Sequence, residues 1–151
     1  MKIVIIKYNA GNIESVNNAL LRLGVSAEIT GDHDKIRKAD KVIFPGVGEA
    51  STTMAYLKKE GLDMLIPELK QPVLGICLGL QLMCSHSEEG ETPCLGIFEE
   101  KVKRFIPEPG MEFITKVPHM GWNSISQLKS GIFDPSLDNQ YVYFVHSYYA
   151  A

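Results

Sequence analysis

Residues 73–83 read Val-Leu-Gly-Ile-Cys-Leu-Gly-Leu-Gln-Leu-Met. The first part is a short apolar run, typical of a strand buried on both faces, and the second part has the apolar spacing of a helix. Cys77 stands at the junction, between Gly75 and Gly79. Flanking glycines remove the side chains that would clash in a tight strand-to-helix turn. The stretch therefore predicts an α/β fold with a cysteine at the tip of a turn.

This cysteine is a candidate nucleophile. The turn projects its sulfur away from the sheet, and the N-terminus of the following helix carries partial positive charge that favours thiolate over thiol. The backbone N–H of Leu78, next to the sulfur, can also stabilise an oxyanion. The alternative is a cysteine packed between two glycines, because free cysteine is among the most buried residue types. The position of Cys77 between strand and helix favours the nucleophile.

Strand and helix patterns alternate through the first half of the chain. Apolar runs predict three further strands, at Ile3–Ile6, Val25–Thr30 and Val42–Phe44. Helical spacing covers Ile13–Leu23, Asp34–Ala39 and Ala50–Leu69, the last interrupted near Gly61. Repeated strand–helix–strand units predict a mostly parallel central sheet with helices on both faces, which is a three-layer, flavodoxin-like α/β sandwich.

The second half of the chain has a different pattern. We expect a polar loop at Glu88–Pro93 and strands at Val102–Ile106, Val117 and Tyr141–Val145. No linker or repeat divides the chain, so residues 1–151 are predicted to form one domain. Only six residues follow the apolar run Tyr141–Val145, whereas a central strand of an α/β sheet is normally followed by more covering chain. The predicted fold is therefore incomplete at its C-terminal end.

Composition excludes several classes of partner. Lys and Arg total 15 against 18 Asp and Glu, and a net charge of −3 argues against a nucleic-acid or anionic-membrane surface. No apolar stretch approaches the roughly 20 residues of a membrane span, and Lys7 ends the N-terminal apolar run too early for a signal peptide. Three cysteines in such a chain predict reduced thiols in the cytoplasm. Packing roles are favoured over metal binding for Cys84 and Cys94, and we expect neither a metal nor a cofactor.

A second loop complements the cysteine turn. Gly46, Val47 and Gly48 follow Pro45 at the end of the preceding strand. Glycines in this position let backbone N–H groups face a ligand in the crevice where α/β sheets bind. Alone, the segment is most simply a turn. Beside Cys77, one strand later, it is predicted to form the second half of an oxyanion hole.

The turn at Cys77, extended by Leu80 and Gln81, resembles the nucleophile elbow of the class I glutamine amidotransferases. Within that family, the chain is similar to the glutaminase subunits of imidazole glycerol phosphate synthases. Five further segments carry this resemblance in family order along the chain: Tyr8–Asn12, Pro45–Glu49, Ser87–Gly90, Pro118–Asn123 and Tyr143–Tyr148. The elbow is common to the whole class, whereas the loop at Tyr8–Asn12 and the Gly-Trp-Asn of residues 121–123 are more discriminating.

The resemblance implies a glutaminase reaction. Cys77 would attack the side-chain amide of glutamine and form a glutamyl thioester, with release of ammonia. The oxyanion would lie against the backbone of Gly46, Val47, Gly48 and Leu78. The resemblance assigns the amino-acid end of glutamine to Gln81, Glu89, Ser147 and Tyr148. A carboxylate at Glu89 suits the ammonium group of that substrate.

The resemblance also implies a heterodimer. The partner would be a cyclase subunit with a (β/α)₈ barrel, which uses the ammonia to form imidazole glycerol phosphate in histidine biosynthesis. The docking face would include Asn12, Trp122 and Tyr143. The alternative for Trp122 is a core aromatic, although tryptophan is also enriched among interface anchors.

A thiol nucleophile needs a group that takes its proton and later protonates ammonia. The family supplies a histidine from a Gln-Phe-His-Pro-Glu segment beyond the Tyr143–Tyr148 match, and residues 1–151 contain no such segment. We therefore expect the domain to lack its last strands and helix, and the 151-residue chain not to turn over glutamine by itself. Its intact elbow favours a fragment of an active enzyme over a non-catalytic docking subunit. A flavodoxin-like phosphate-binding module is a third interpretation.

Overall fold

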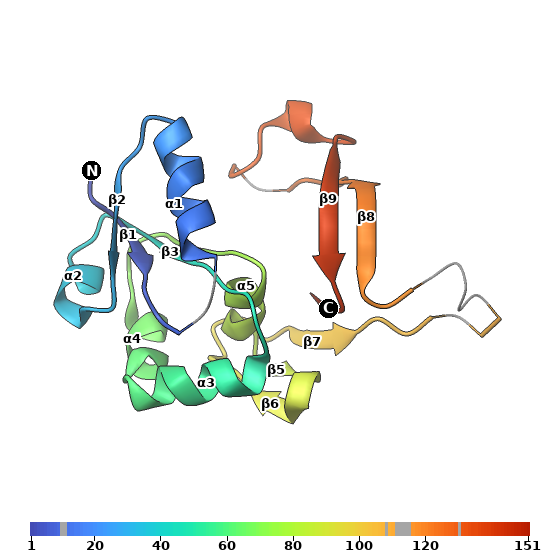
Figure 1. Cartoon of the computed structure of the whole chain (residues 1–151), viewed down its shortest axis with the longest axis horizontal. Helices are drawn as coiled ribbons and strands as arrows, with labels where there is room; N and C mark the ends of the chain where they lie inside the picture. Colours follow the sequence, from blue (N-terminus) through green and yellow to red (C-terminus); the bar gives the residue numbers. More distant parts are fainter. Residues whose placement is uncertain (10–11, 108, 111–115, 130) are drawn as a thin grey trace. The chain divides into compact units, whose positions relative to one another are not determined.

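The computed structural model describes residues 1–151 apart from 10–11, 108, 111–115 and 130. Ala10 and Gly11 of the predicted Tyr8–Asn12 loop thus lie outside the described residues. The chain forms two compact units, one of residues 1–103 with 150–151 and one of residues 104–149. Figure 1 labels the α-helices of the described residues and most of the strands. That all residues belong to one domain stays a prediction.

A parallel sheet forms the centre of the first unit. Its strands are β1 (Ile3–Ile6), β2 (Ala27–Thr30), β3 (Lys41–Phe44) and β4 (Val73–Gly75), in the order β2-β1-β3-β4. All three neighbouring pairs are parallel. Every residue of β1 is buried, as expected of a strand covered on both faces. The prediction of a mostly parallel sheet is confirmed.

Helices cover both faces of this sheet. On one face, α1 (Ile13–Arg22) packs Ile13, Val16 and Leu20 against side chains of β1 and β3. The other face carries the larger core, to which four helices contribute: α2 (His33–Arg37), α3 (Ala50–Lys59), α4 (Leu62–Glu68) and α5 (Leu78–Met83). Gly61 separates α3 from α4 at a φ of 69°, which favours glycine, so the predicted interruption is confirmed.

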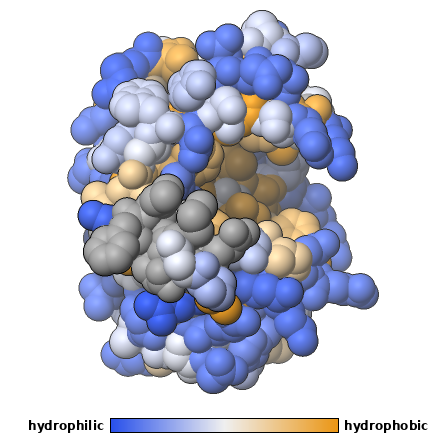
Figure 2. Space-filling model, turned by 90° about the vertical axis from the view of Figure 1, so that its right-hand side faces the viewer, coloured by the Kyte–Doolittle hydropathy of each residue, from blue (hydrophilic) through white to orange (hydrophobic). Residues whose placement is uncertain are grey.

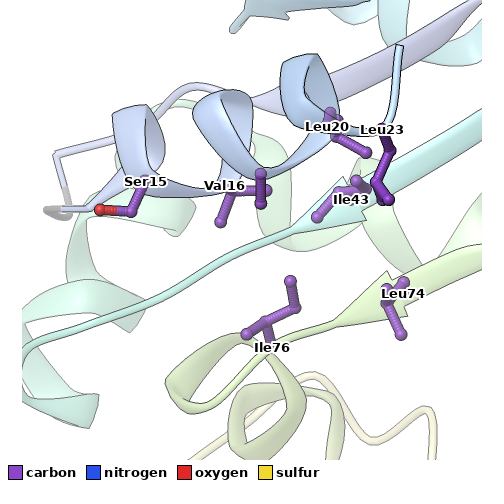
Figure 3. A pocket seen from close by; sticks show the side chains of 8 residues that line it. Ser15, Val16, Leu20, Leu23, Ile43, Leu74 and Ile76 are labelled. Carbon is purple, nitrogen blue, oxygen red and sulfur yellow. The ribbon is translucent and has the colours of Figure 1, made fainter. Parts of the chain in front are cut away.

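The face covered by α1 retains an apolar groove of about 280 Å³. Figure 3 shows side chains of α1, Ile43 of β3 and Leu74 of β4 turned toward this space, with Ile76 just beyond β4. Leu74 and Ile76 remain partly exposed there. The groove lies on the side of the sheet that α1 alone covers among the described helices.

A second sheet follows α5, with strands β10 (Tyr148–Ala150), β7 (Lys101–Arg104), β5 (His86–Ser87) and β6 (Thr92–Pro93) in that order. The polar loop predicted at Glu88–Pro93 is wrong in part, because this segment contains a 3₁₀ turn, η1 (Glu89–Glu91), and the strand β6. Ser87 and Thr92 pair across the two strands and are buried. The Thr92 hydroxyl donates to the Glu89 carbonyl at 2.7 Å, which explains how a polar residue is accommodated there.

The second unit contains the antiparallel strands β8 (His119–Ser124) and β9 (Tyr141–His146), with the 3₁₀ turn η2 (Pro135–Leu137) between them. The strand at Tyr141–Val145 is confirmed. A strand at Val117 is wrong: pairing begins at His119, because Pro118 has no N–H to donate to a ladder. Most side chains of both strands are exposed. Figure 2 shows one face of the molecule, on which hydrophobic and hydrophilic residues are mixed. No helix in the described ranges is long and apolar enough to cross a membrane.

Candidate active site

The carboxyl ends of three adjacent strands bring the candidate residues to one edge of the parallel sheet. Tyr8 follows β1, Pro45–Gly48 follow β3, and Cys77 follows β4 by one residue. The strand order β1-β3-β4 makes these three loops neighbours. This edge is where open α/β sheets bind their ligands.

Cys77 has the backbone of a strained turn. Its φ of 54° and ψ of −119° are rare for a residue with a side chain, and such strain persists only where the surroundings enforce it. Hydrogen bonds on both sides hold the turn: Ile76 N–H donates to the Phe44 carbonyl at 3.0 Å, and Gln81 N–H to the Cys77 carbonyl at 3.1 Å. The Cys77 side chain is exposed.

The other two cysteines lie in different surroundings. Burial raises the pKa of the Cys84 thiol, and the nearby charge of Glu100 adds to that effect. Burial, followed by the charge of Cys84, raises the pKa of Cys94 to about 11. Both therefore stay protonated at neutral pH, which suits the packing role predicted for them.

Glycines allow the elbow to approach the end of β3. A Cβ on Gly79 would lie 1.9 Å from the Phe44 carbonyl oxygen, and one on Gly46 would lie 2.6 Å from the Gly79 nitrogen. A Cβ on Gly75 would lie 2.7 Å from the Leu80 Cα. Any side chain at these positions would push β3, β4 and α5 apart.

The predicted oxyanion loop contacts this elbow. Gly46 is buried against the start of α5, where a Cβ would also lie 2.9 Å from the Leu78 Cβ. Val47 and Gly48 are exposed, and Gly48 has a φ of 127°. Leu78 is the first residue of α5, so its N–H is one of those with no acceptor inside the helix. The fold thus brings Gly46 and Leu78 together beside Cys77.

Tyr8 is a residue that sequence reasoning treated only as part of a loop. It is 5% exposed, its ring packs on Phe44 at a centroid distance of 5.5 Å, and its hydroxyl donates to the Pro45 carbonyl. Burial, and then the charge of Cys77, raises the pKa of Tyr8 above its usual range. The available signal was its position just past a fully buried strand.

Two carboxylates occupy the N-terminus of α3, immediately after the Gly46–Gly48 loop. Glu49 accepts from the Thr52 N–H at 2.9 Å, the Ser51 hydroxyl at 2.9 Å and the Ser51 N–H at 3.1 Å, and these contacts lower its pKa to about 2. Glu89 reaches the same end from η1 and accepts from Ala50 N–H at 2.9 Å. Burial raises the pKa of Glu89; the Ala50 hydrogen bond opposes this rise, and the charge of Glu49 adds to it.

The remaining predicted substrate residues divide between the units. Gln81 is half-buried on α5 in the first unit. Ser147 and Tyr148 belong to the second unit, where the Ser147 carbonyl accepts from Phe105 N–H at 2.9 Å. Nearby, the His146 ring lies 2.9 Å from the Tyr148 carbonyl oxygen through its Nδ1. No group of histidine, cysteine and carboxylate side chains in the part of the chain that the structure describes could hold a metal ion.

Two of the predicted docking residues form a pair on the hairpin. Trp122 and Tyr143 stand directly opposite each other on β8 and β9, with ring centroids 5.6 Å apart in an edge-to-face arrangement. They are 68% and 54% exposed, so the core alternative for Trp122 is wrong. Asn12, in the first unit, is exposed and precedes α1 with a φ of 71°.

The sequence matches known proteins over nearly its full length. The family model described as glutamine amidotransferase class-I matches residues 4–151. An imidazole glycerol phosphate synthase subunit HisH of Bacteroides fragilis is 63% identical over 149 residues, which are 99% of this chain and 74% of that protein. Proteins of the same name from Idiomarina loihiensis and Haemophilus influenzae are 44% and 46% identical over 100% and 98% of this chain, and 74% and 72% of their own lengths.

A solved structure supports the fold. A crystal structure of a glutamine amidotransferase superposes with a TM-score of 0.57, at 24% sequence identity. The match covers 67% of this chain and 56% of that one.

Proposed function

Because the chain belongs to the class-I glutamine amidotransferase family, we propose that it releases ammonia from glutamine through Cys77 and supplies it to a partner subunit of an imidazole glycerol phosphate synthase. The geometry of Cys77 carries the proposal: an exposed thiol on a strained turn, at the ligand-binding edge of a parallel sheet. Support comes also from relatives named as subunits of that synthase, at 44–63% identity.

The reaction follows from the groups around the thiol. The Cys77 sulfur attacks the carbonyl carbon of the side-chain amide, and the π electrons of that carbonyl move to its oxygen. Backbone N–H groups of the Gly46–Gly48 loop and of Leu78 hold the resulting oxyanion. When the oxyanion collapses, the carbon–nitrogen bond breaks, and the nitrogen leaves as ammonia with the proton that the thiol has lost. Water then hydrolyses the thioester to glutamate and regenerates the thiol.

Glu89 is the proposed partner of the substrate's ammonium group. Its carboxylate is half-buried, lies near a second carboxylate, and has one backbone donor in the Ala50 N–H. A cation placed beside it would offset the cost of ionising it there. Gln81, Ser147 and Tyr148 complete the proposed set around the amino-acid end of glutamine.

The proposed partner is a cyclase subunit with a (β/α)₈ barrel. Trp122 and Tyr143 form an exposed aromatic pair on β8 and β9, which is the kind of anchor that dominates protein interfaces. Asn12 is the third proposed docking residue. A reducing cytoplasm is the proposed compartment, because the three cysteines are free thiols.

The test is an assay of the subunit together with its partner, on a version of the protein that includes the family's Gln-Phe-His-Pro-Glu segment, because the resemblance assigns the proton-transferring histidine to that segment. We expect Cys77→Ala to lower glutamine-dependent ammonia release by several powers of ten, while the partner still forms product when ammonia is added directly. Cys94→Ala, at a half-buried thiol that directly follows β6, is the matched control and should retain activity. Glutamine hydrolysis by Cys77→Ala at the wild-type rate would exclude the proposal.

A further inference from the structure

We propose that Tyr8 is a positioning residue for the oxyanion loop, and that its hydroxyl fixes the orientation of the Pro45–Gly46 peptide relative to Cys77. The inference deepens the proposed function and rests on it, because it assigns the loop at Gly46–Gly48 the role of oxyanion donor. Tyr8 itself is a buried side chain of the neighbouring strand end. Its action is therefore through the backbone of the loop.

The argument begins with the peptide plane. In a trans peptide, the carbonyl of one residue and the N–H of the next point in opposite directions. The Tyr8 hydroxyl donates to the Pro45 carbonyl, so it holds that oxygen on the side of the loop that faces the core. The Gly46 N–H is thereby turned to the opposite side. One hydrogen bond thus decides which way the first amide of the loop points.

Close packing makes this contact specific to the loop and the elbow together. A Cβ on Gly46 would lie 2.7 Å from the Tyr8 hydroxyl and 2.6 Å from the Gly79 nitrogen. Gly46 is thus enclosed between Tyr8 on one strand end and the start of α5 on another. Any rotation of the Pro45–Gly46 peptide would have to move one of these neighbours.

The remainder of the Tyr8 side chain is anchored, so the hydroxyl is a fixed donor. Its ring packs on Phe44 within the main core of the first unit. Because burial and the nearby Cys77 raise its pKa, the hydroxyl keeps its proton whenever the thiolate forms. Loss of the hydroxyl would leave the Pro45 carbonyl without this donor and let glycine at position 46 adopt other orientations.

The experiment compares two reagents on Cys77 in the purified subunit with its partner present. A diazoketone analogue of glutamine presents a carbonyl oxygen to the oxyanion loop when the sulfur attacks. With iodoacetamide, the sulfur displaces iodide directly at a saturated carbon, and no oxyanion forms. We expect Tyr8→Phe to slow the reaction with the glutamine analogue roughly tenfold to hundredfold and to leave the iodoacetamide rate within about twofold. In a version of the protein that includes the family's Gln-Phe-His-Pro-Glu segment, glutamine kcat should fall by a similar factor, with KM little changed.

Tyr56→Phe is the matched control, because Tyr56 on α3 packs partly against the same core. It should leave both rates unchanged. If Tyr8→Phe slows both reagents equally, the hydroxyl acts on the thiol or on general stability, and the inference is wrong. Equal rates for Tyr8→Phe and wild type with both reagents would overturn it as well. If wild-type Cys77 fails to react selectively with the glutamine analogue, the proposed function itself fails.

Discussion

Adding one methyl group at Gly79 tests how the elbow is held against the sheet. A Cβ there would lie 1.9 Å from the Phe44 carbonyl oxygen, about 1.5 Å short of the 3.4 Å at which ordinary contact begins. The obstacle is backbone and cannot rotate away. The same Phe44 oxygen also accepts the 3.0 Å hydrogen bond from Ile76 N–H that ties β4 to the end of β3. Gly79→Ala therefore has to separate α5 from β3 or break this bond.

The expected cost follows from overpacking and from the threatened hydrogen bond. Overpacking a tight site costs typically 1–3 kcal/mol, and a lost buried hydrogen bond adds about 1 kcal/mol. We expect Gly79→Ala to lower the free energy of unfolding by roughly 3 kcal/mol, which is roughly 6–12 °C in Tm for a protein of this size. Because Cys77 lies two residues away, labelling of Cys77 by the glutamine analogue should slow by at least tenfold.

Two other glycines serve as controls, with stability measured by urea denaturation. A Cβ on Gly131 or on Gly24 meets no atom within 4 Å, and only Gly24 has a positive φ, of 72°. Gly131→Ala should be neutral within about 0.5 kcal/mol, and Gly24→Ala should cost about 1 kcal/mol through backbone strain alone. If Gly79→Ala lowers the free energy of unfolding by no more than Gly24→Ala does, α5 does not pack against β3 as tightly as the 1.9 Å distance indicates.

Three further predictions concern α3 and the hairpin. Glu49→Gln should lower the free energy of unfolding by about 1 kcal/mol at pH 7. The folded pKa of Glu49 is lowered from 4.5 to about 2, so the difference in free energy of unfolding should shrink as the pH falls below 4.5 and vanish near pH 2. Urea denaturation as a function of pH measures this. A difference that stays constant with pH would mean that Glu49 does not cap α3. Glu89→Gln should raise KM for glutamine about tenfold or more, because a charged hydrogen bond to the ammonium group is lost. It should not lower the free energy of unfolding at pH 7. An unchanged KM would remove Glu89 from the proposed pocket. Trp122→Ala should weaken partner binding roughly thirtyfold or more by calorimetry and leave stability unchanged, whereas Ile132→Ala, an equally exposed apolar residue, should leave binding unchanged.

The parallel sheet could be predicted from the sequence because local signals agree there. The buried runs Ile3–Ile6 and Val42–Phe44 have no polar residue to compete with a strand. The apolar spacing after Cys77 indicated the start of a helix, and α5 begins there. Polar segments were harder, because their burial depends on partners distant in sequence. Thr92 is buried by pairing with Ser87, and the local pattern of residues 88–93 does not indicate that pairing.

Candidate site residues show the same division. Cys77 was identifiable because a strand, two glycines and a helix surround it within a few residues. The contribution of Tyr8 depends on the Pro45 carbonyl, 37 residues away, and becomes visible only when β1 and β3 are neighbours. The exposed pair of Trp122 and Tyr143 depends on the register of β8 and β9, which the glycine-containing segment 119–124 does not reveal by itself.

The position of Glu89 opposes the electrostatics of the fold. The N-terminus of α3 already has a carboxylate, Glu49, which satisfies Ser51 and Thr52 and is stabilised in its charged form. Glu89 brings a second negative charge to the same end, in a half-buried place where its pKa is raised, so its ionised form costs stability at neutral pH. The neutral side chain of Glu89→Gln could accept the same 2.9 Å hydrogen bond from Ala50 N–H. An acid held where an amide would serve the fold better supports the proposal that Glu89 binds a cation, which in the proposed reaction is the ammonium group of the substrate.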